Sequence, residues 1–415
     1  MTGLALTFAP LTALITRHAD RSAYAPAMSA ATSLSRPSLA EIAREWSRIG
    51  CIGFGGPPAH IALLRTLCVQ QRRWLSEAQF ERAIAATNLL PGPASTQLAI
   101  YCAWRLRGGA GALVGGTCFI VPGLIVILAL SVLFLAGSPP AWVRGAGLGA
   151  GSAIAAVAVR VGGDVALPIW RRADRRATQL RIVAYALAGG AAAATAGPWL
   201  VLVLLACGAL ELIWRGALRD ARAAVLHWPL LAAVTTTGDI GALAWTAFKV
   251  GALAFGGGFV IVPLMEADAV GHHHWMTHAQ FLNAVALGQI TPGPVTQTVA
   301  AVGYAAGGLG AGLLAALIAF APSFCFILIG ARRFERLLHD ERVIAFLAGA
   351  APAAAGAIIG AAIPLTRALG ENWQYPLLGA AAVALILLRR SVVTTLLLAG
   401  LVGTLAALLG APLPH

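Results

Sequence analysis

Long runs of apolar residues, separated by short polar segments, cover most of the chain from about residue 38 onward. A helix needs about 20 apolar residues to cross a bilayer, and several of the runs reach that length. The runs lack the short alternating segments of membrane β-barrels, and lipid offers backbone groups no other partner. The pattern therefore predicts an all-α polytopic membrane protein.

The pattern also predicts where the helices lie. The stretches predicted in the first part of the chain are 39–55, 58–71, 75–90, 94–106, 109–136, 142–168, 182–196 and 198–214. Those predicted in the second part are 241–256, 259–271, 277–291, 294–307, 309–330, 342–365, 375–388 and 391–410. Several are too short to cross alone. We expect them to be half-helices or hairpins, broken at Phe-Gly-Gly and at Pro-Gly-Pro.

The same pattern occurs twice, and a shift of 201 residues superimposes the copies without a gap from about residue 46 to residue 99. Phe54-Gly55-Gly56 aligns with Phe255-Gly256-Gly257. Trp74 aligns with Trp275, and Pro91-Gly92-Pro93 aligns with Pro292-Gly293-Pro294. A duplication of this length in so apolar a chain predicts a transporter built from two related halves.

The repeat divides the chain into four parts. Residues 38–222 form the first repeat, 223–238 a linker, and 239–415 the second repeat. Residues 1–37 are rich in Ala, Ser, Thr and Pro and lack the apolar core of a signal peptide. We expect this segment to be disordered or a non-native extension, with Met28 as an alternative start.

Composition narrows the functional class. Hydrophobic residues make up 59% of the chain and charged residues 11%, and the mean hydropathy is +0.81. The net charge of +13 comes almost entirely from arginines in short loops, so the lipid bilayer is the expected partner and nucleic acid is not. The six cysteines are scattered without a CxxC pair, and no catalytic motif is present. We therefore expect no cofactor, no metal and no enzymatic activity.

Arginine placement predicts how the halves are oriented. The loops at 170–181 and 331–342 are arginine-rich, whereas their repeat counterparts at 371–382 and 130–141 are nearly free of basic residues. Under the positive-inside rule, equivalent loops with opposite bias face opposite sides of the membrane. The sequence therefore predicts an inverted-topology repeat, with a shared site near the midplane where the halves meet.

The Pro-Gly-Pro segments are the first candidate site. Proline interrupts the preceding helix, and a helix that restarts after it presents free N–H groups and a partial positive charge to an anion. The alternative is a proline kink whose freed carbonyls are satisfied locally. Two matched copies favour the site. The polar residues predicted to line it are Asn88, Ser95, Thr96, Gln97, Gln289, Thr296 and Gln297.

The Phe-Gly-Gly segments are the second candidate, because tandem glycines allow positive φ and close approach of the backbone to a ligand. Tight helix packing through small residues explains them equally well. The copies diverge afterwards, with Pro57-Pro58 in the first and Gly258-Phe259 in the second. His60, which follows the first copy, is a candidate polar contact.

Ionisable residues are the third group, because a charge within a membrane segment marks a functional candidate. Arg48 and Lys249, the only lysine, occupy the same repeat position and are predicted to balance the charge of an anion. Snorkelling to the interface is the alternative. Glu266 and Asp268 are candidates for a coupling proton. The run His272-His273-His274 invites a metal interpretation, which we do not favour.

Together these motifs resemble the chromate ion transporter family in its long two-domain form. The resemblance rests on Phe54 to His60, Arg73 to Ser76 and Leu89 to Pro93 in the first half. In the second half it rests on Phe255 to Gly258, Pro263-Leu264, Trp275, Gln280-Phe281 and Gly288 to Pro294. It covers about residues 39 to 412 and implies a multi-pass protein of the bacterial inner membrane that expels chromate and confers resistance.

The resulting prediction is a secondary transporter that moves a tetrahedral oxyanion between the halves, driven by an ion gradient or the membrane potential. A carrier for sulfate or another oxyanion with the same architecture is the first alternative. A membrane-embedded enzyme and a passive anion channel are the others. The sequence leaves the substrate preference, the coupling ion and the oligomeric state open, with a homodimer among the options.

Overall fold

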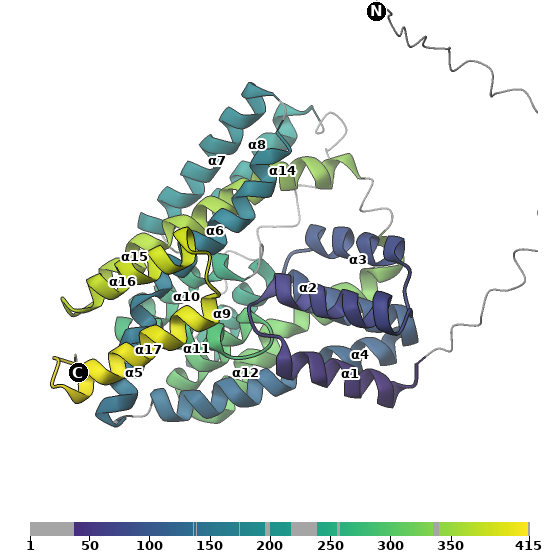
Figure 1. The fold of residues 1–415 in the computed structure, drawn as a ribbon. Helices are drawn as coiled ribbons and strands as arrows, with labels where there is room; N and C mark the ends of the chain where they lie inside the picture. Colours follow the sequence, from purple (N-terminus) through teal and green to yellow (C-terminus); the bar gives the residue numbers. More distant parts are fainter. Residues whose placement is uncertain are drawn as a thin grey trace, which may run out of the picture. The chain divides into compact units, whose positions relative to one another are not determined.

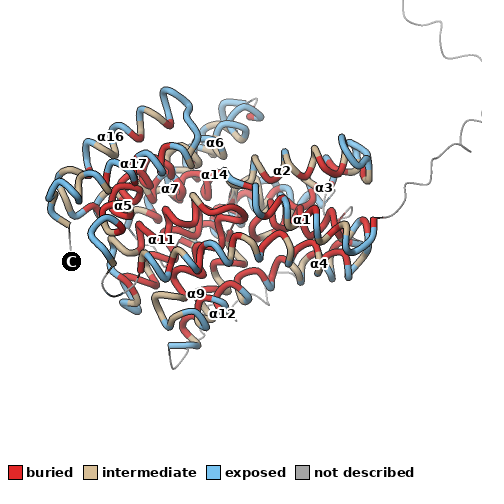
Figure 2. The backbone as a smooth tube through the Cα atoms, turned by 60° about the horizontal axis from the view of Figure 1, so that its bottom comes forward, coloured by how far each residue is buried: buried red, intermediate tan, exposed pale blue. Residues whose placement is uncertain are grey.

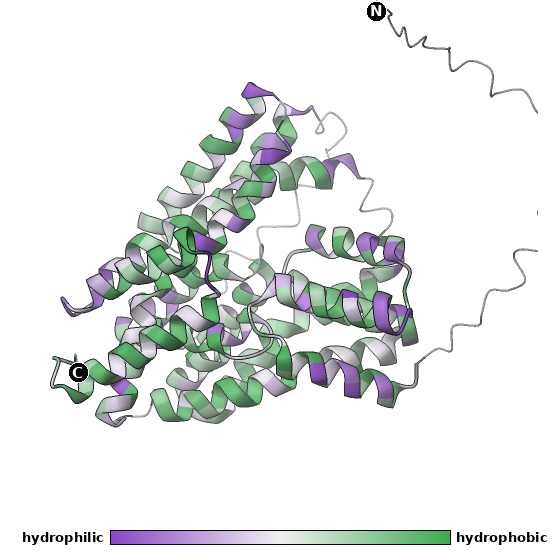
Figure 3. Ribbon diagram, in the orientation of Figure 1, coloured by the Kyte–Doolittle hydropathy of each residue, from purple (hydrophilic) through white to green (hydrophobic). Residues whose placement is uncertain are grey.

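The computed structural model describes residues 37–135, 137, 139–173, 175–195, 200–216, 239–254, 258–334 and 340–413. Within these ranges the regular elements are helices. Four of them are long and apolar enough to cross a membrane: Ala94–Phe134, Ala141–Arg171, Val295–Gly330 and Glu341–Arg367. The predicted all-α membrane fold is confirmed, and Figure 3 shows that hydrophobic residues predominate along its helices. The predicted linker, Phe255-Gly256-Gly257 and the tail before Pro37 lie outside the described residues.

Short connections join the helices of the first half, which Figure 1 labels from α1 to α8. They are α1 (Leu39–Ile52), α2 (Pro57–Arg65), the π-helical turn η1 (Thr66–Gln71), α3 (Glu77–Leu89), α4 (Ala94–Phe134), α5 (Ala141–Ser152), α6 (Ile154–Arg171), α7 (Arg176–Thr195) and α8 (Leu200–Trp214).

The second half repeats this order, and its equivalents of α2 and α4 are each divided into a 3-10 turn and an α-helix. Its elements up to the long helix are α9 (Asp239–Leu253), η5 (Phe259–Ile261), α10 (Val262–Glu266), η6 (Ala267–His272), α11 (His278–Ile290), η7 (Val295–Gln297) and α12 (Thr298–Gly330). The remaining elements are η8 (Ala331–Arg333), α14 (Glu341–Gly360), α15 (Ala362–Arg367), α16 (Gln374–Ala382), η9 (Val383–Leu387) and α17 (Val392–Leu408).

Local geometry recurs where the local sequence dictates it. Helices α3 and α11 both begin with a capping box, Ser76 with Gln79 and Thr277 with Gln280. In each box the hydroxyl accepts from the third backbone N–H of the helix, while the glutamine oxygen accepts from the N–H of the cap residue. A π-helical turn, η1 or η6, precedes each box at the same repeat position. The two halves therefore share one backbone path into their Pro-Gly-Pro segments.

The long helices α4 and α12 are both bent where the sequence predicts a break. The non-helical backbone lies at Arg107–Gly108 in α4 and at Gly307–Gly308 in α12. Gly108 and Gly308 have φ of 62° and 75°, a region that favours glycine. These glycines are 200 residues apart, whereas the Pro-Gly-Pro segments are 201 apart. The second half is therefore one residue shorter between its Pro-Gly-Pro and its bend.

The parts of α4 and α12 beyond these bends pack against each other in opposite directions. A Cβ at Gly109, early in this part of α4, would lie 3.6 Å from Leu328, late in α12. A Cβ at Gly312, early in this part of α12, would lie 2.8 Å from Leu128, late in α4. Equivalent helices of the two halves are thus antiparallel neighbours.

Each half also packs against the final hairpin of the other. Helix α5 runs along α17, where Gly145 and Gly149 allow the backbones to touch at Gly403 (Figure 1). Helix α14, the counterpart of α5, packs on α7 and α8, with Gly189 against Ala353. Small residues at these crossings are typical of helix packing within membranes. The halves are therefore interlocked.

Burial differs between equivalent helices. In α11 every residue from Phe281 to Gln289 is buried, because α5, α12 and α17 all contact this helix (Figure 2). In α3 the buried residues are Phe80, Ala83, Ala86 and Thr87, which form one face of the helix. The first half of the candidate site is therefore more open than the second.

Candidate functional site

The two Pro-Gly-Pro segments interrupt helices at equivalent positions. The first lies between the end of α3 at Leu89 and the start of α4 at Ala94. The second lies between the end of α11 at Ile290 and the 3-10 turn η7 at Val295. Their central glycines, Gly92 and Gly293, have φ of 116° and 93°. Glycine is needed at both positions because side chains strongly disfavour this backbone conformation.

Each segment is held against the opposite half of the protein. A Cβ at Gly92 would lie 3.2 Å from the carbonyl oxygen of Gly251 on α9 and 3.5 Å from Ser323 Oγ on α12. A Cβ at Gly123 on α4 would come closer still to the carbonyl oxygen of Pro292 and to the side chain of Gln297. The site is therefore built at the junction of the halves and belongs to both.

A short hydrogen-bonded chain connects the two breaks. The N–H of Gly293 donates to the carbonyl oxygen of Gly53, at 3.0 Å. His60 Nε2 lies 2.9 Å from that same oxygen, and His60 Nδ1 lies 3.2 Å from Ser95 Oγ at the start of α4. A carbonyl only accepts, so Nε2 carries the proton; in the neutral ring Nδ1 then accepts from the Ser95 hydroxyl. His60 is fully buried and fixes Ser95 relative to the second Pro-Gly-Pro.

A Thr-Gln pair opens each restarted helix, Thr96-Gln97 in the first half and Thr296-Gln297 in the second. Gln97 Nε2 donates to the carbonyl of Pro91 at 2.6 Å, and Gln297 Nε2 donates to the carbonyl of Ile120 at 2.8 Å. All four residues are at most 1% exposed. The pairs are 200 residues apart, so the residue that the second half lacks lies between Pro-Gly-Pro and this pair.

Polar atoms without partners gather at these segments. Nine buried side-chain atoms in the described part of the chain have no hydrogen-bond partner, and seven lie on or directly beside the Pro-Gly-Pro segments. The seven are Thr96 Oγ1, Gln97 Oε1, Gln289 Nε2, Thr291 Oγ1, Thr296 Oγ1, Gln297 Oε1 and Ser323 Oγ. Each such group costs about 1–3 kcal/mol when left unsatisfied. Their concentration in one place indicates a site for water or a polar ligand.

The Phe-Gly-Gly segment that the structure describes borders the same place. It connects α1 to α2, with φ of 96° at Gly55 and 74° at Gly56. Gly56 approaches Val295, and Gly258, with φ of 91°, approaches Val295 and Thr296 Oγ1. Phe54 is 44% exposed, and Asn88 is exposed as well. The backbone of this segment, and not its phenylalanine, therefore faces the second Pro-Gly-Pro.

The two predicted basic residues have other partners. Arg48 lies 3.7 Å from Glu45 and its side chain is 62% exposed. Lys249 Nζ lies 2.5 Å from Asp268 Oδ2, which also accepts from the Thr246 hydroxyl at 2.9 Å. The contacts described for Arg48 and Lys249 thus leave them outside the cluster of unpartnered atoms.

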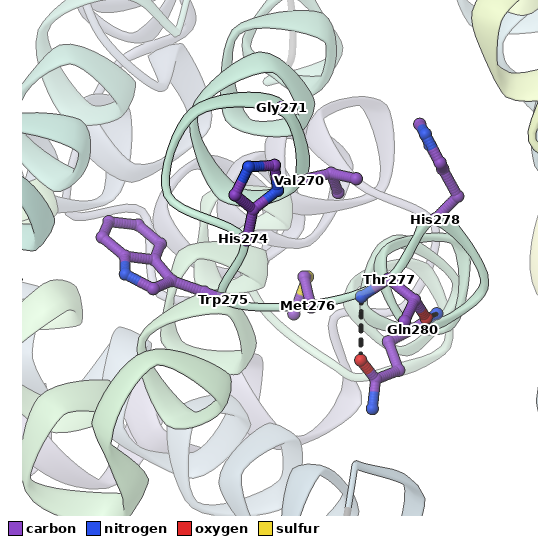
Figure 4. A pocket seen from close by; sticks show the side chains of 8 residues that line it. All are labelled: Val270, Gly271, His274, Trp275, Met276, Thr277, His278 and Gln280. Carbon is purple, nitrogen blue, oxygen red and sulfur yellow. Dashed lines mark hydrogen bonds between the residues drawn. The ribbon is translucent and has the colours of Figure 1, made fainter. Parts of the chain in front are cut away.

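The histidine run lies at a different place. His274 and His278 border a cavity of about 620 Å³ at the turn between η6 and α11, together with Trp275 and Gln280 (Figure 4). No group of three or more His, Cys, Asp or Glu residues in the described part of the chain is placed to hold a metal ion. His278 instead pairs with Glu266 at 3.1 Å.

Sequence reasoning missed three contributors to the site. Ser323 follows Pro322 in an otherwise apolar helix, where a hydroxyl beside a helix proline was the available signal. Thr291 directly precedes the second Pro-Gly-Pro, where its hydroxyl was the available signal, but the sequence prediction included Gln289 instead. Gly251 contributes only a backbone carbonyl, for which the sequence gives no signal.

Known proteins are similar in sequence to this chain over most of its length. The chromate transport protein of Cupriavidus metallidurans is 29% identical over 391 residues, which is 91% of this chain and 94% of that protein. The chromate transport protein of Pseudomonas aeruginosa is 29% identical over 378 residues, 85% of this chain and 88% of that protein. The probable chromate transport protein of Synechococcus elongatus is 28% identical over 348 residues, 80% of this chain and 85% of that protein. No solved structure matches the chain.

The family model for chromate transporters matches this chain twice, at residues 40–212 and again at 241–404. The two matches cover the two halves that the fold interlocks, including both Pro-Gly-Pro segments. Because they span well over half of the chain, the protein belongs to the chromate transporter family.

Proposed function

We propose that the protein is a secondary transporter that exports chromate across the bacterial inner membrane and thereby confers chromate resistance. The observation that carries this proposal is the cluster of seven unpartnered buried polar atoms at the two Pro-Gly-Pro segments. The names of its relatives, which are chromate transport proteins, supply the substrate.

The site suits an oxyanion for reasons of chemistry. The hydroxyls of Thr96, Thr296 and Ser323 are unpartnered and can each donate to an oxyanion oxygen. The first N–H groups of α4, which is regularly helical from Ala94 to its bend at Arg107, add the partial positive charge of a helix N-terminus. Ser95 donates to His60 and so positions the start of α4 without binding the oxyanion itself.

Inverted topology is part of the proposal, and the antiparallel packing of α4 and α12 supports it. Both helices are long enough to span the membrane, and they are equivalent members of the two halves. Two equivalent spanning helices that run in opposite directions are related by an axis in the membrane plane. The opposite arginine bias of equivalent loops agrees with that axis. Rocking of the interlocked halves then exposes the site to each side in turn.

The membrane potential can drive export without a nucleotide. Moving one negative charge out of a negative-inside cell releases about 2.3 kcal/mol per 100 mV, and roughly twice that for two charges. We propose that this energy, with or without exchange for another ion, drives the cycle.

The test is uptake of labelled chromate into everted membrane vesicles that contain the wild type, Thr96→Val or Thr296→Val. Loss of a hydrogen bond to a charged ligand is worth about 1.5–3 kcal/mol, so each variant should lose roughly 10- to 100-fold in uptake efficiency. Thr366→Val, in which a threonine of α15 that bonds within its own helix is replaced, is the matched control. Absence of saturable uptake by the wild type, or equal uptake by all variants, would contradict the proposal.

A further inference from the structure

We propose that the site binds its oxyanion in the singly protonated form, such as hydrogen chromate, and that Gln97 Oε1 or Gln297 Oε1 accepts the hydrogen bond from the substrate hydroxyl. The inference rests on the proposed transport function and names the form of the substrate that the site selects.

The argument begins with the orientation of the two amides. Gln97 Nε2 and Gln297 Nε2 each donate to a backbone carbonyl, and a carbonyl oxygen only accepts hydrogen bonds. An amide flipped the other way would face that carbonyl with its own oxygen. The nitrogen is therefore fixed on the carbonyl side, and each Oε1 is left as an acceptor without a donor.

A dianion cannot satisfy these oxygens. Chromate and sulfate without a proton carry acceptors only, so an amide oxygen turned toward either of them is repelled. A protonated oxyanion carries one O–H donor and three further oxygens. It can therefore donate to a glutamine oxygen while it accepts from the hydroxyls of Thr96, Thr296 or Ser323. The mixture of unpartnered donors and acceptors matches that form of the substrate.

The charge around the site leads to the same conclusion. Removal of a charge from water is costly unless the charge is paired, and the cost rises with the number of charges. Arg48 is exposed beside Glu45, and Lys249 is bound to Asp268. His60, the titratable side chain in the hydrogen-bonded chain, uses Nε2 on Gly53 and Nδ1 on Ser95. A monoanion requires less compensation than a dianion from hydroxyls and a helix N-terminus alone.

This selection would separate two ions of similar size and shape. Hydrogen chromate loses its proton near neutral pH, whereas hydrogen sulfate is a strong acid, so sulfate is a dianion throughout the physiological range. A site built to bond a substrate hydroxyl rejects an analogue without one by a factor of about 10⁴–10⁵. The substrate carries its proton across the membrane and releases it to water, with one net negative charge moved per cycle.

The experiment uses the purified protein in liposomes, with equal pH on both sides and ionophores that prevent a gradient. Uptake of micromolar labelled chromate is measured from acidic to alkaline pH, with sulfate and selenate as competitors. Only the protonated fraction binds, so the KM for total chromate should rise about 10-fold per pH unit above the pKa of hydrogen chromate, with kcat unchanged. A large excess of sulfate or selenate should not inhibit at any pH.

Three variants and a control assign the effect. Gln97→Met and Gln297→Met each remove one of the two candidate acceptors, and at least one of them should lower the preference for chromate over sulfate by at least about 10-fold. Gln374→Met replaces another buried glutamine, which bonds the carbonyl of Leu148 on α5, and should leave that preference unchanged. His60→Gln should keep the pH slope; loss of the slope in this variant would assign the proton to the protein and overturn the proposal.

Failure of this inference can be told from failure of the transport function. A wild type without saturable chromate uptake at any pH would reject the function, and this inference with it. Saturable uptake with a pH-independent KM and competition by sulfate at similar concentration would reject the protonated form alone.

Discussion

In both halves an ion pair connects the helix before the π-helical turn to the helix after it, but the acidic and basic residues exchange places between the halves. In the first half, Arg65 at the end of α2 pairs with Glu77 and Glu81 on α3. One repeat later the acidic residue comes first, and Glu266 at the end of α10 pairs with His278 at the start of α11. Residues 65 and 266 are equivalent, as are residues 77 and 278. The junction is preserved although its charges are exchanged.

A second pair of equivalent junctions is also held by an ion pair, with the acidic and basic residues on exchanged elements but at positions that are not equivalent in the repeat. Glu45 on α1 binds Arg72 after η1 at 2.7 Å, whereas Lys249 on α9 binds Asp268 on η6 at 2.5 Å. Coulomb attraction between two charges does not depend on which partner carries which sign. The two halves can therefore share one backbone scaffold and differ in where they place their charges.

The segments at the candidate site differ between the halves more than these junctions do. The first half has the His60–Ser95 contact, whereas the second has Ile261 at the position of His60 and lacks one residue before its Thr-Gln pair. Its helix therefore restarts with the 3-10 turn η7 and not with an α-helical turn. The symmetry of the scaffold thus stops at the residues of the candidate site.

The largest effect that we expect concerns the central glycines. Gly92→Ala would place a Cβ 2.6 Å from Gln97 Nε2, whereas the closest approach at Gly293 is 3.0 Å. Strain from positive φ and overpacking each cost about 1–3 kcal/mol, so Gly92→Ala should destabilise the protein by about 2–4 kcal/mol and Gly293→Ala by less. Thermal unfolding in detergent measures both. Gly379→Ala, with open space around its Cβ and an ordinary helical φ, should not destabilise. A larger loss at Gly293 would reverse the comparison.

A smaller effect should distinguish the two junctions by pH. The Glu266–His278 pair is charged on both sides only while His278 is protonated, whereas the arginine of the first junction stays charged. Burial raises the pKa of Glu266, so both partners are charged only at mildly acidic pH, where His278 is protonated and Glu266 is still ionised. Double-mutant cycles with Glu266→Gln and His278→Gln should give a coupling of about 1 kcal/mol at mildly acidic pH that disappears at alkaline pH. The cycle with Arg65→Gln and Glu77→Gln should give the same value, below about 1 kcal/mol, at both. Equal pH dependence of the two couplings would refute this distinction.

An effect of similar size should come from the contact that only one half has. Ser95→Ala removes the donor to His60 Nδ1 and should cost about 0.5–1.5 kcal/mol in the free energy of unfolding, with reduced but measurable chromate uptake. Ser131→Ala is the control, since its hydroxyl bonds Ile127 within the same helix. If the two serine variants were equally stable and equally active, the His60–Ser95 contact would have no role.

The sequence predicted the features that depend on local chemistry. Both Pro-Gly-Pro breaks, the bends of the two long helices and the resemblance to the chromate transporter family follow from residue identity and spacing. The gap-free alignment continued through residue 99, because Ser95 and Thr296 matched as hydroxyl residues. It therefore concealed the missing residue, which the structure reveals through the equivalence of Gly108 with Gly308.

Features that depend on tertiary contacts were beyond the sequence. Charge alone made Arg48 and Lys249 candidates for the site. In the fold they pair with Glu45 and Asp268, and both partners are far in sequence from the Pro-Gly-Pro segment of their own repeat. Ser323 and Gly251 reach the site only because the halves cross there. No spacing rule within one half predicts a contact made by the other.

The interlocking of the halves also has a consequence for biosynthesis. Helices α7 and α8 are translated before α14, the helix that packs on both of them. Until residues Glu341–Gly360 leave the ribosome, the glycine-lined surface of this hairpin lacks the helix that packs on it in the folded protein. Helix α5 remains uncovered even longer, since its neighbour α17 is translated after α14. Packing of the N-terminal half is thus incomplete until residues Val392–Leu408 have been translated.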